Sequence, residues 1–177
     1  MSGEGRWAKR QFDFGFSVDL YPELIERLRG TPARIEERVG SFPDFMLTLR
    51  DGESWSIQEN AGHLLDLEPL FVGRLGEYSA GAEILRRADM SNRKTWQAQH
   101  NHDSIESILA KFRQERFMPV ERLENWKPSQ FGLSAIHPRL NVPMRLVDMM
   151  FFHAEHDDHH LARITDLARR LVEPHDS

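Results

Sequence analysis

The stretch FFHAEHDDHHLARI, residues 151–164, contains four histidines and three acidic residues but no glycine or proline. Apolar residues recur around it at helical spacing, so we expect a helix that begins near Pro143 and ends near Val172. At about 1.5 Å per residue this helix is roughly 45 Å long, which is enough to run the length of a four-helix bundle.

Polar side chains interrupt the apolar face of this helix. At 100° per residue, one face holds Leu146, Met149, Met150, His153, Asp157, His160, Leu161, Ile164, Leu167 and Leu171. Burying a polar group costs free energy unless the group is paired or bound to something. The histidines of this helix therefore need partners inside the protein.

A second helix is marked most clearly at its start. Ser56 and Glu59 in SIQE fit a capping box, with Ser56 as the N-cap, and the helix should continue to about Tyr78. Its apolar stripe is formed by Ile57, Leu64, Leu67, Phe71 and Leu75.

Two further helices complete the predicted bundle. The first follows Asp19 as its N-cap and stops at Gly30, after which Thr31–Pro32 starts a continuation through VG at residues 39–40. The other begins at Asp103, with Pro119 as a kink or break.

The connections are expected to be irregular. Residues 80–101 should contain only a short helix around Ile84–Arg87, and residues 127–142, with two prolines and a glycine, are typical of a loop. With no convincing strand pattern, the predicted fold class is all-α, a four-helix bundle. We expect one domain over residues 1–177, with 1–17 as an N-terminal extension and 173–177 as a frayed tail.

Composition limits the classes of function. The 177 residues are 40% hydrophobic and 29% charged, and the net charge of -5 comes without a long acidic block. Arginines alternate with acids at helical spacing, which indicates solvated helix faces and no nucleic-acid partner.

No window approaches the roughly 18 apolar residues of a membrane span and no signal region is present, so we expect a cytoplasmic protein without a membrane partner. The absence of cysteine leaves histidine and carboxylate as metal ligands.

Three histidines are the candidates for a metal site. His156 and His160 are i,i+4 neighbours on one helix, so they can present two nitrogens to one ion. A third ligand must come from another element, and His63 lies on or beside the apolar stripe of the second helix. Pairs of histidines at i,i+4 also arise by chance. The alternative interpretation is therefore that these histidines form a buried hydrogen-bond network without a metal.

The other histidines are assigned from their positions. His153 shares the face of His160 but lies two turns away, so we expect it in a pocket wall or next to the ligands without binding the metal itself. His159 should face a neighbouring helix or solvent, and His175 belongs to the tail. Three more fall in expected loops and should be exposed: His100, His102 and His137.

Nearby carboxylates could orient the ligands or accept a proton. Glu59 lies one turn before His63 and Asp66 just under one turn after it, while Asp157 flanks His156. For Glu59 the capping role is favoured.

With these residues in place, the chain resembles the DinB superfamily of metal-binding four-helix bundles, and within it the YfiT-like metal-dependent hydrolases. The resemblance covers nearly the whole chain and is carried by LIERLRGTPARIEERV near the start, WSIQENAGHLLDLE at 55–68, HP at 137–138 and HAEHDDHHLARI at 153–164. The family's histidine on the second helix and its H-x-x-x-H pair on the last fall on His63, His156 and His160. Arg163 stands where related sequences often carry a polar amide. This difference does not affect the three ligands, but the resemblance does not define the residues that surround them.

The resemblance implies a divalent metal ion held by three imidazoles, with open positions taken by water. Zinc or nickel is expected first, with manganese or iron as alternatives. It also implies a small-molecule substrate. Characterised relatives include thiol-dependent transferases and isomerases, so a low-molecular-weight thiol is a candidate cosubstrate. Hydrolysis and thiol transfer both stay open.

Two further expectations concern a non-catalytic function and the oligomeric state. A non-catalytic bundle that binds a metal or small ligand, for instance in a stress response, predicts a fourth protein ligand such as His153 or Asp157. A homodimer is suggested by the apolar residues Trp7, Phe12, Phe14 and Phe16, which could instead cover the end of the bundle.

Overall fold

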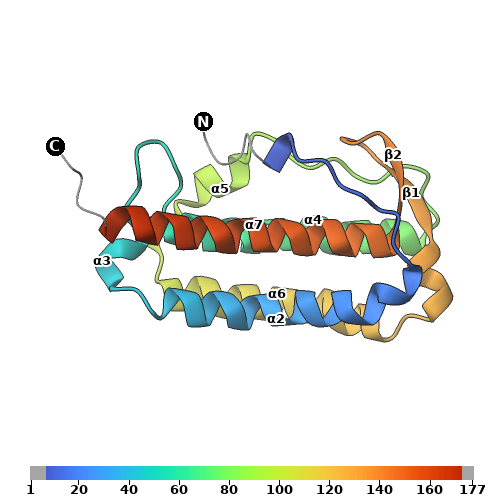
Figure 1. The fold of residues 1–177 in the computed structure, drawn as a ribbon, viewed down its shortest axis with the longest axis horizontal. Coiled ribbons are helices and arrows are strands. Elements are labelled where there is room, and N and C mark those ends of the chain that lie inside the picture. The colour runs from blue at the N-terminus through green and yellow to red at the C-terminus, as the bar shows by residue number, and fades with distance from the viewer. Residues whose placement is uncertain (1–6, 173–177) are drawn as a thin grey trace.

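The computed structural model describes residues 7–172, which form an elongated bundle of four long helices (Figure 1). These helices are α2 (Tyr21–Val39), α4 (Ile57–Ser79), α6 (Ile105–Glu124) and α7 (Leu146–Val172). The predicted helical bundle is thereby confirmed. Within the described residues, none of the helices combines the length and the apolar character that crossing a lipid bilayer requires.

Each long helix packs against two others. The neighbouring pairs are α2 with α6, α6 with α4, α4 with α7 and α7 with α2. Figure 1 shows that α4 and α6 run in one direction and that α2 and α7 run in the other. As a result α4 and α7 are antiparallel neighbours, and the connection over residues 80–104 must return along the bundle before α6 can begin.

The helix α2 is continuous where the sequence predicted a stop. Gly30 and Pro32 both lie inside it, and the helix ends only at Val39. Leu28 and Ile35 on either side are completely buried. Packing of this inner face outweighs the weak local preference of glycine and proline against helix.

Two predicted helix starts are off by one or two residues. The side chain of Ser17, in place of Asp19, caps the short 3-10 helix η1 (Val18–Leu20) that leads into α2. Similarly α6, which was expected to begin at Asp103, begins at Ile105 with Ser104 as its N-cap. This helix then continues through residue 119 without the predicted break.

The connections contain helices at other places than predicted. Ile84 forms an isolated parallel bridge with Ile136, so the expected helix over 84–87 is wrong. Backbone hydrogen bonds to this partner hold residues 83–85 extended. The helices of the connections are α3 (Asp44–Leu47), α5 (Arg93–Ala98) and the 3-10 helices η2 (His100–His102) and η3 (Pro128–Gly132).

A small sheet corrects the all-α prediction and the predicted loop over 127–142. Strands β1 (Ser134–His137) and β2 (Val142–Arg145) pair antiparallel. The turn between them places Asn141 at φ 55°, a left-handed conformation that asparagine tolerates better than most residues. Because Pro143 belongs to β2, the helix α7 begins at residue 146.

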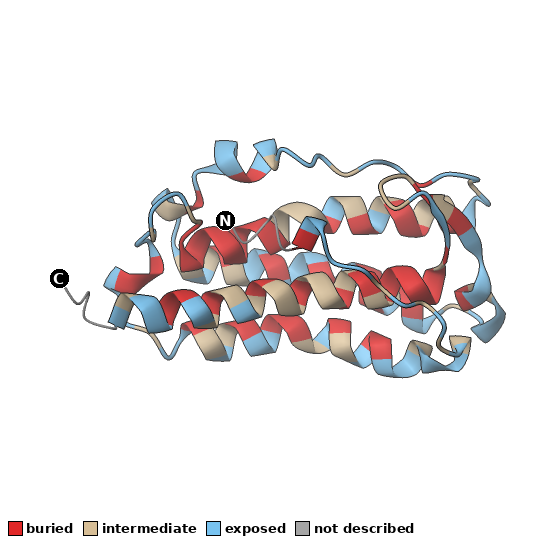
Figure 2. Cartoon of the chain, turned by 45° about the horizontal axis from the view of Figure 1, so that its top comes forward, coloured by how far each residue is buried: buried red, intermediate tan, exposed pale blue. Residues whose placement is uncertain are grey.

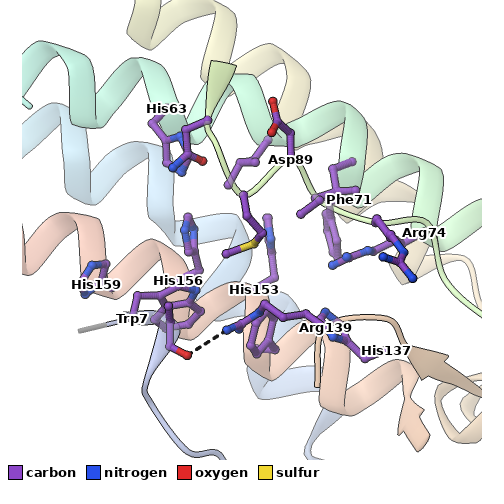
Figure 3. A pocket seen from close by; sticks show the side chains of 18 of the residues that line it. Trp7, His63, Phe71, Arg74, Asp89, His137, Arg139, His153, His156 and His159 are labelled. Atoms are coloured by element: carbon purple, nitrogen blue, oxygen red, sulfur yellow. Dashed lines mark hydrogen bonds between the residues drawn. The ribbon is translucent and has the colours of Figure 1, made fainter. Parts of the chain in front are cut away.

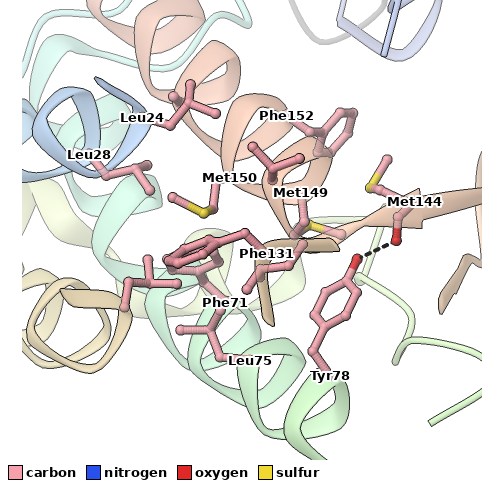
Figure 4. Close-up of a cluster of buried hydrophobic side chains, with 14 of the residues drawn as sticks. Leu24, Leu28, Phe71, Leu75, Tyr78, Phe131, Met144, Met149, Met150 and Phe152 are labelled. Atoms are coloured by element: carbon pink, nitrogen blue, oxygen red, sulfur yellow. Dashed lines mark hydrogen bonds between the residues drawn. The ribbon is translucent and has the colours of Figure 1, made fainter. Parts of the chain in front are cut away.

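The interior consists of two apolar clusters. One fills the end where α4 finishes and α7 begins (Figure 4), and it includes Leu24, Leu28, Phe71, Leu75, Phe131, Met149 and Met150. The other fills the opposite end and includes Ile35, Ile57, Leu64, Phe112, Ile164 and Leu167. Figure 2 shows the buried residues along the inward faces of the helices.

A polar layer separates the two clusters. It takes one residue from each long helix, namely Thr31, Glu68, Arg116 and Asp157, and each is at most 1% exposed. The guanidinium of Arg116 donates to Glu68 at 2.7 Å and to Asp157 at 2.6 Å. The Thr31 hydroxyl donates to Asp157 at 2.8 Å. Complete burial of these charges is tolerated because they are paired and hydrogen-bonded.

Residues 7–16 lie along α7, whereas the sequence left open that they cover the end of the bundle. Its aromatic rings pack on two phenylalanines of α7, with Trp7 and Phe12 against Phe152, and Phe14 and Phe16 against Phe151. These N-terminal aromatic residues thus have partners within their own chain.

Candidate metal centre

The three histidines predicted as ligands meet at the interface of α4 and α7. His63 faces His156 and His160, and one nitrogen of each lies within 4.8 Å of the other two. Antiparallel packing brings the early turns of α4 beside this part of α7. Figure 3 shows His63 and His156 pointing toward one another from the two helices. We call these three residues the triad.

The hydrogen bonds of Asn60 fix the tautomer of His160. The Asn60 amide nitrogen donates to the carbonyls of Trp55 and Ser56, so its oxygen must be the atom that faces His160. That oxygen lies 2.8 Å from Nδ1 of His160, which therefore carries the proton. The lone pair of Nε2 is left to face the other two histidines.

His63 is oriented in the same way by Thr95. Nδ1 of His63 lies 3.0 Å from Oγ1 of Thr95, and the Thr95 hydroxyl is also hydrogen-bonded to the Asp66 carboxylate. Because a carboxylate only accepts, the hydroxyl donates to Asp66 and accepts from Nδ1–H of His63. Nε2 of His63 again keeps its lone pair. His100 completes the chain, with its Nε2 2.9 Å from Asp66.

His156 completes the triad with a spacing that suits a metal ion. Its Nε2 lies 3.3 Å from Nε2 of His160. Two nitrogens bound to one tetrahedral zinc ion at 2.0–2.1 Å are themselves about 3.3 Å apart. Nδ1 of His156 is buried without a hydrogen-bond partner in the described residues, and the ring of Trp7 packs on it at 5.0 Å between centroids.

Burial keeps the triad neutral. It lowers the pKa of His63 to about 4. Burial, followed by the neighbouring histidines, lowers the pKa values of His156 and His160 well below 6.5. Neutral imidazole is the form that binds a metal ion, so these side chains need not lose a proton to do so at neutral pH. The donor set, its spacing and the tautomers fixed for His63 and His160 all fit one divalent ion.

The triad opens into a cavity of about 550 Å³. Its apolar wall is formed by Leu67, Leu70, Phe71, Met149 and Phe152. The aromatic residues Trp7 and Trp55 flank the triad on the cavity side. A largely apolar cavity with a few polar groups at defined places is the usual form of a small-molecule site.

The four carboxylate and histidine candidates around the triad have different partners. Glu59 forms the predicted capping box with Ser56 and also pairs with Arg50, so it does not orient a ligand. Asp66 does reach the triad, through Thr95 as described above.

Of the remaining two candidates, Asp157 belongs to the polar layer and His153 lies beside it. Asp157 accepts from Arg116, and Nε2 of His153 lies 3.0 Å from the same guanidinium. His153 also stacks on Phe71 at 4.1 Å between centroids and lines the cavity, as expected of a pocket wall. Neither residue is hydrogen-bonded to a triad imidazole in the described part of the chain.

Two of the histidines expected in exposed loops are buried. His100 is 4% and His137 is 2% exposed, whereas His102 is exposed as predicted. The segments that carry them, η2 and β1, pack against α4 and α7, which the sequence pattern does not reveal. His159 lines the cavity beside the ring of Trp7, and His175 lies outside the described residues.

Several residues of the site were missed by sequence reasoning. Asn60 precedes His63 by three residues, so helical spacing could have identified it as a neighbour. Thr95 and Trp7 come from segments without periodicity, and no local signal pointed to them.

Comparison with known proteins supports the fold independently. The family model of the DinB superfamily matches residues 27–164. Among solved structures, the chain is similar to YfiT from Bacillus subtilis, described as a probable metal-dependent hydrolase with an unusual four-helix bundle topology. The two share 22% sequence identity, with a TM-score of 0.77 over 92% of this chain and 93% of that one. At this identity the likeness establishes the fold alone. No curated protein matches the chain significantly.

Proposed function

Because this chain belongs to the DinB superfamily, we propose that it is a metal-dependent hydrolase of a small molecule, with its divalent ion held by His63, His156 and His160. One observation carries the proposal. Three neutral imidazoles from two helices turn their nitrogens toward a common point at the wall of a cavity. The description of the similar protein YfiT as a probable metal-dependent hydrolase agrees with it.

When bound, such an ion supplies Lewis-acid chemistry, which lowers the pKa of a water molecule or a thiol in its open coordination positions. The chain's own residues would hold the ion and fix its surroundings. Asn60 and Thr95 hold the ligand rings in one tautomer, and the rings of Trp7 and Trp55 limit access of bulk water to the triad.

The positions opposite the triad are proposed to stay open for substrate. The two candidates for a fourth protein ligand, His153 and Asp157, are both held by Arg116. A closed, non-catalytic site would need one of them to leave this buried pairing. The engagement of both residues therefore favours an enzyme over a storage or structural site.

Zinc and nickel are the metals that we propose first. Imidazole ligands suit zinc, nickel, copper and iron better than calcium or magnesium, which prefer oxygen. The spacing of 3.3 Å between Nε2 of His156 and Nε2 of His160 suits a tetrahedral ion such as zinc.

Transfer of a low-molecular-weight thiol is the second candidate reaction. The observation that favours it is the apolar wall beside the triad, formed in part by Leu67 and Phe71, because an apolar environment leaves a thiolate poorly solvated and reactive. The chain contains no cysteine, so the sulfur would have to come from a cosubstrate.

Elemental analysis of untagged protein tests the metal site. We expect about one divalent ion per chain in the wild type and loss of that ion in His63→Ala and His160→Ala. His102→Ala, which removes an exposed histidine, is the matched control and should retain the ion. Failure of the wild type to take up zinc, nickel or manganese would refute the proposal.

Activity assays then separate the two reactions. Metal-loaded and chelator-treated protein should be assayed against ester, amide and lactone substrates, and against an electrophile with an added thiol. Hydrolysis that depends on the metal and needs no thiol supports the first candidate, and strict dependence on the thiol supports the second.

A further inference from the structure

The cavity that begins at the triad ends at a group of cationic side chains. Arg74, His137 and Arg139 lie together at the end away from His63 (Figure 3). His63 and Arg74 are eleven residues apart, which is about three full turns, so they share one face of α4 with roughly 16 Å of helix between them. We call these three residues the cationic end.

The residues between the two ends of the cavity are mostly apolar, with His153 beside Phe71 as a polar exception. Leu67, Leu70 and Phe71 follow His63 along the same face of α4, and Met149 faces them from α7. The cavity therefore offers the triad, a largely apolar middle and a positive end in that order.

Arg74 is a buried cation without a carboxylate partner. It is 5% exposed. Its guanidinium donates to the backbone carbonyl of Arg86 at 3.0 Å and lies 3.7 Å from the sulfur of Met149. In the described part of the chain no aspartate or glutamate forms an ion pair with it. A buried guanidinium normally has an anionic partner, and this one lines a cavity instead.

His137 contributes a hydrogen-bond donor, its Nε2–H, to the cationic end. Its Nδ1 accepts the backbone N–H of Leu140 at 3.2 Å. Burial, followed by the charges of Arg74 and Arg139, lowers the pKa of His137 to about 4, so the ring is neutral at pH 7 and its proton must sit on Nε2. That Nε2 is buried and has no hydrogen-bond partner among the described residues.

Arg139 supplies a second guanidinium. It donates through Nη1 to the carbonyl of Ala8 at 3.2 Å, while its Nη2 is buried without a partner in the described residues. Its side chain also lies over the ring of Phe152 at 5.6 Å. The cationic end thus combines two positive charges and a neutral donor, and two of its buried nitrogen donors have no acceptor among the described residues.

Among the described residues that line the cavity, Asp89 is the only acidic one, and it does not neutralise this end. Asp89 is an exposed residue whose carboxylate accepts from the backbone N–H groups of Ser91 and Arg93 in its own turn. Arg87 lines the cavity nearby and adds a further positive charge.

We propose that Arg74, His137 and Arg139 form a binding subsite for an anionic oxygen group, a carboxylate or a phosphate ester, at one end of the substrate. The substrate would lay an apolar stem along Leu67, Leu70 and Phe71 and present its reacting group to the triad. The role of the triad end rests on the proposed function, whereas anion binding at the cationic end does not require the metal.

Binding of three probes that share a six-carbon stem tests the subsite by calorimetry. The probes are hexanoate, hexyl phosphate and the neutral hexanamide, and each is titrated into protein dialysed against chelator and into zinc-loaded protein. We expect at least one anion to bind more tightly than the amide in both preparations. Its identity then distinguishes a carboxylate from a phosphate substrate.

Four variants assign the binding to the cationic end. Arg74→Met and Arg139→Met should each weaken the bound anion by about tenfold or more, because each removes a charged hydrogen-bond donor. Arg74→Lys should restore part of the affinity, and Arg169→Met removes an exposed arginine of α7 as the matched control. If Arg74→Met fails to fold, Arg139→Met, whose side chain is only half-buried, decides.

The subsite is refuted if the anions bind no more tightly than the amide, or if both methionine variants bind them like the wild type. The subsite would also be refuted if the anions bound only to zinc-loaded protein and with the same affinity in both methionine variants. The anionic group would then lie at the triad. Arginine-dependent binding in a protein that takes up no metal would sustain the subsite and overturn the proposed hydrolase instead.

Discussion

Oγ1 of Thr95 lies 3.0 Å from Nδ1 of His63, although the two residues are 32 positions apart and belong to different helices. The short helix α5 exists in a connection without strong periodicity, and it carries this hydroxyl to the triad. The bond fixes which nitrogen of His63 is free, so a residue distant in the sequence orients an imidazole of the triad.

The first prediction is that Thr95→Val weakens metal binding. Valine has the shape of threonine but cannot accept from His63, so the ring loses its fixed tautomer and orientation. We expect zinc affinity to fall by roughly 10- to 100-fold, measured by competition with a chromogenic chelator. Thr165→Val is the control, because Thr165 bonds Arg38 and the carbonyl of Leu161, away from the triad. Unchanged affinity in Thr95→Val would contradict the role given to the hydroxyl.

The second prediction concerns the protection of the triad by Trp7, whose ring packs on His156 and His159. Replacement by alanine opens this side to solvent, so zinc should transfer to a chelator several-fold faster than from the wild type. Trp126→Ala removes an indole that contacts Phe131 instead, and it should leave the transfer rate unchanged. Equal transfer rates for all three proteins would argue against a covering role.

The third prediction compares two glycines of α4. A methyl group on Gly62 would overlap the ring of His100, which is buried and held by Asp66. Gly62→Ala should therefore lower the free energy of unfolding by about 1–3 kcal/mol. Gly76→Ala meets no atom within 4 Å and should raise it by about 0.5–1 kcal/mol. Urea denaturation measures both, and a stabilised Gly62→Ala would show that His100 can move freely.

The fourth prediction is a loss of stability in acid that depends on Asp157. Burial alone would raise the pKa of this carboxyl, but the Arg116 guanidinium outweighs burial and lowers the pKa from 3.8 to about 2. A carboxyl with a lowered folded-state pKa stabilises the protein above its unfolded pKa and loses that contribution as pH falls. We expect roughly 2 kcal/mol to be lost between about pH 4 and pH 2.

Asp157→Asn checks this assignment. It removes the charge that pairs with Arg116, so the variant should be less stable at pH 7 by roughly 3 kcal/mol. Its free energy of unfolding should also change less between pH 4 and pH 2 than that of the wild type. Parallel pH profiles for the two proteins would assign the acid sensitivity to other carboxyls, such as Glu68.

The strongest sequence signals predicted the core of the fold and the triad. The capping box at Ser56, the helical spacing of α7 and the i,i+4 pair of His156 and His160 are local patterns, and each is decided by neighbours in the chain. His63 was predicted because two histidines on one helix bind a metal ion only weakly, so a third ligand from another helix is needed.

The errors fall where distant contacts decide the structure. Gly30 stays helical because buried residues surround it, and Pro143 enters a strand because residues 134–137 lie beside it. The burial of His100 and His137 depends on how long connections fold back on the bundle. The cationic end brings together α4 and the hairpin, which no spacing along the sequence could have revealed.

The polar layer of Thr31, Glu68, Arg116 and Asp157 also determines the alignment of the four helices along the bundle axis. Leucine and isoleucine contacts alone would tolerate sliding of one helix by a turn, since apolar side chains are interchangeable in a loose core. Such a slide would separate Arg116 from both carboxylates and leave buried charges unpaired, at a cost of several kcal/mol. The layer therefore excludes shifted packings. Since it also keeps the two apolar clusters apart, redesign of one cluster should combine additively with redesign of the other.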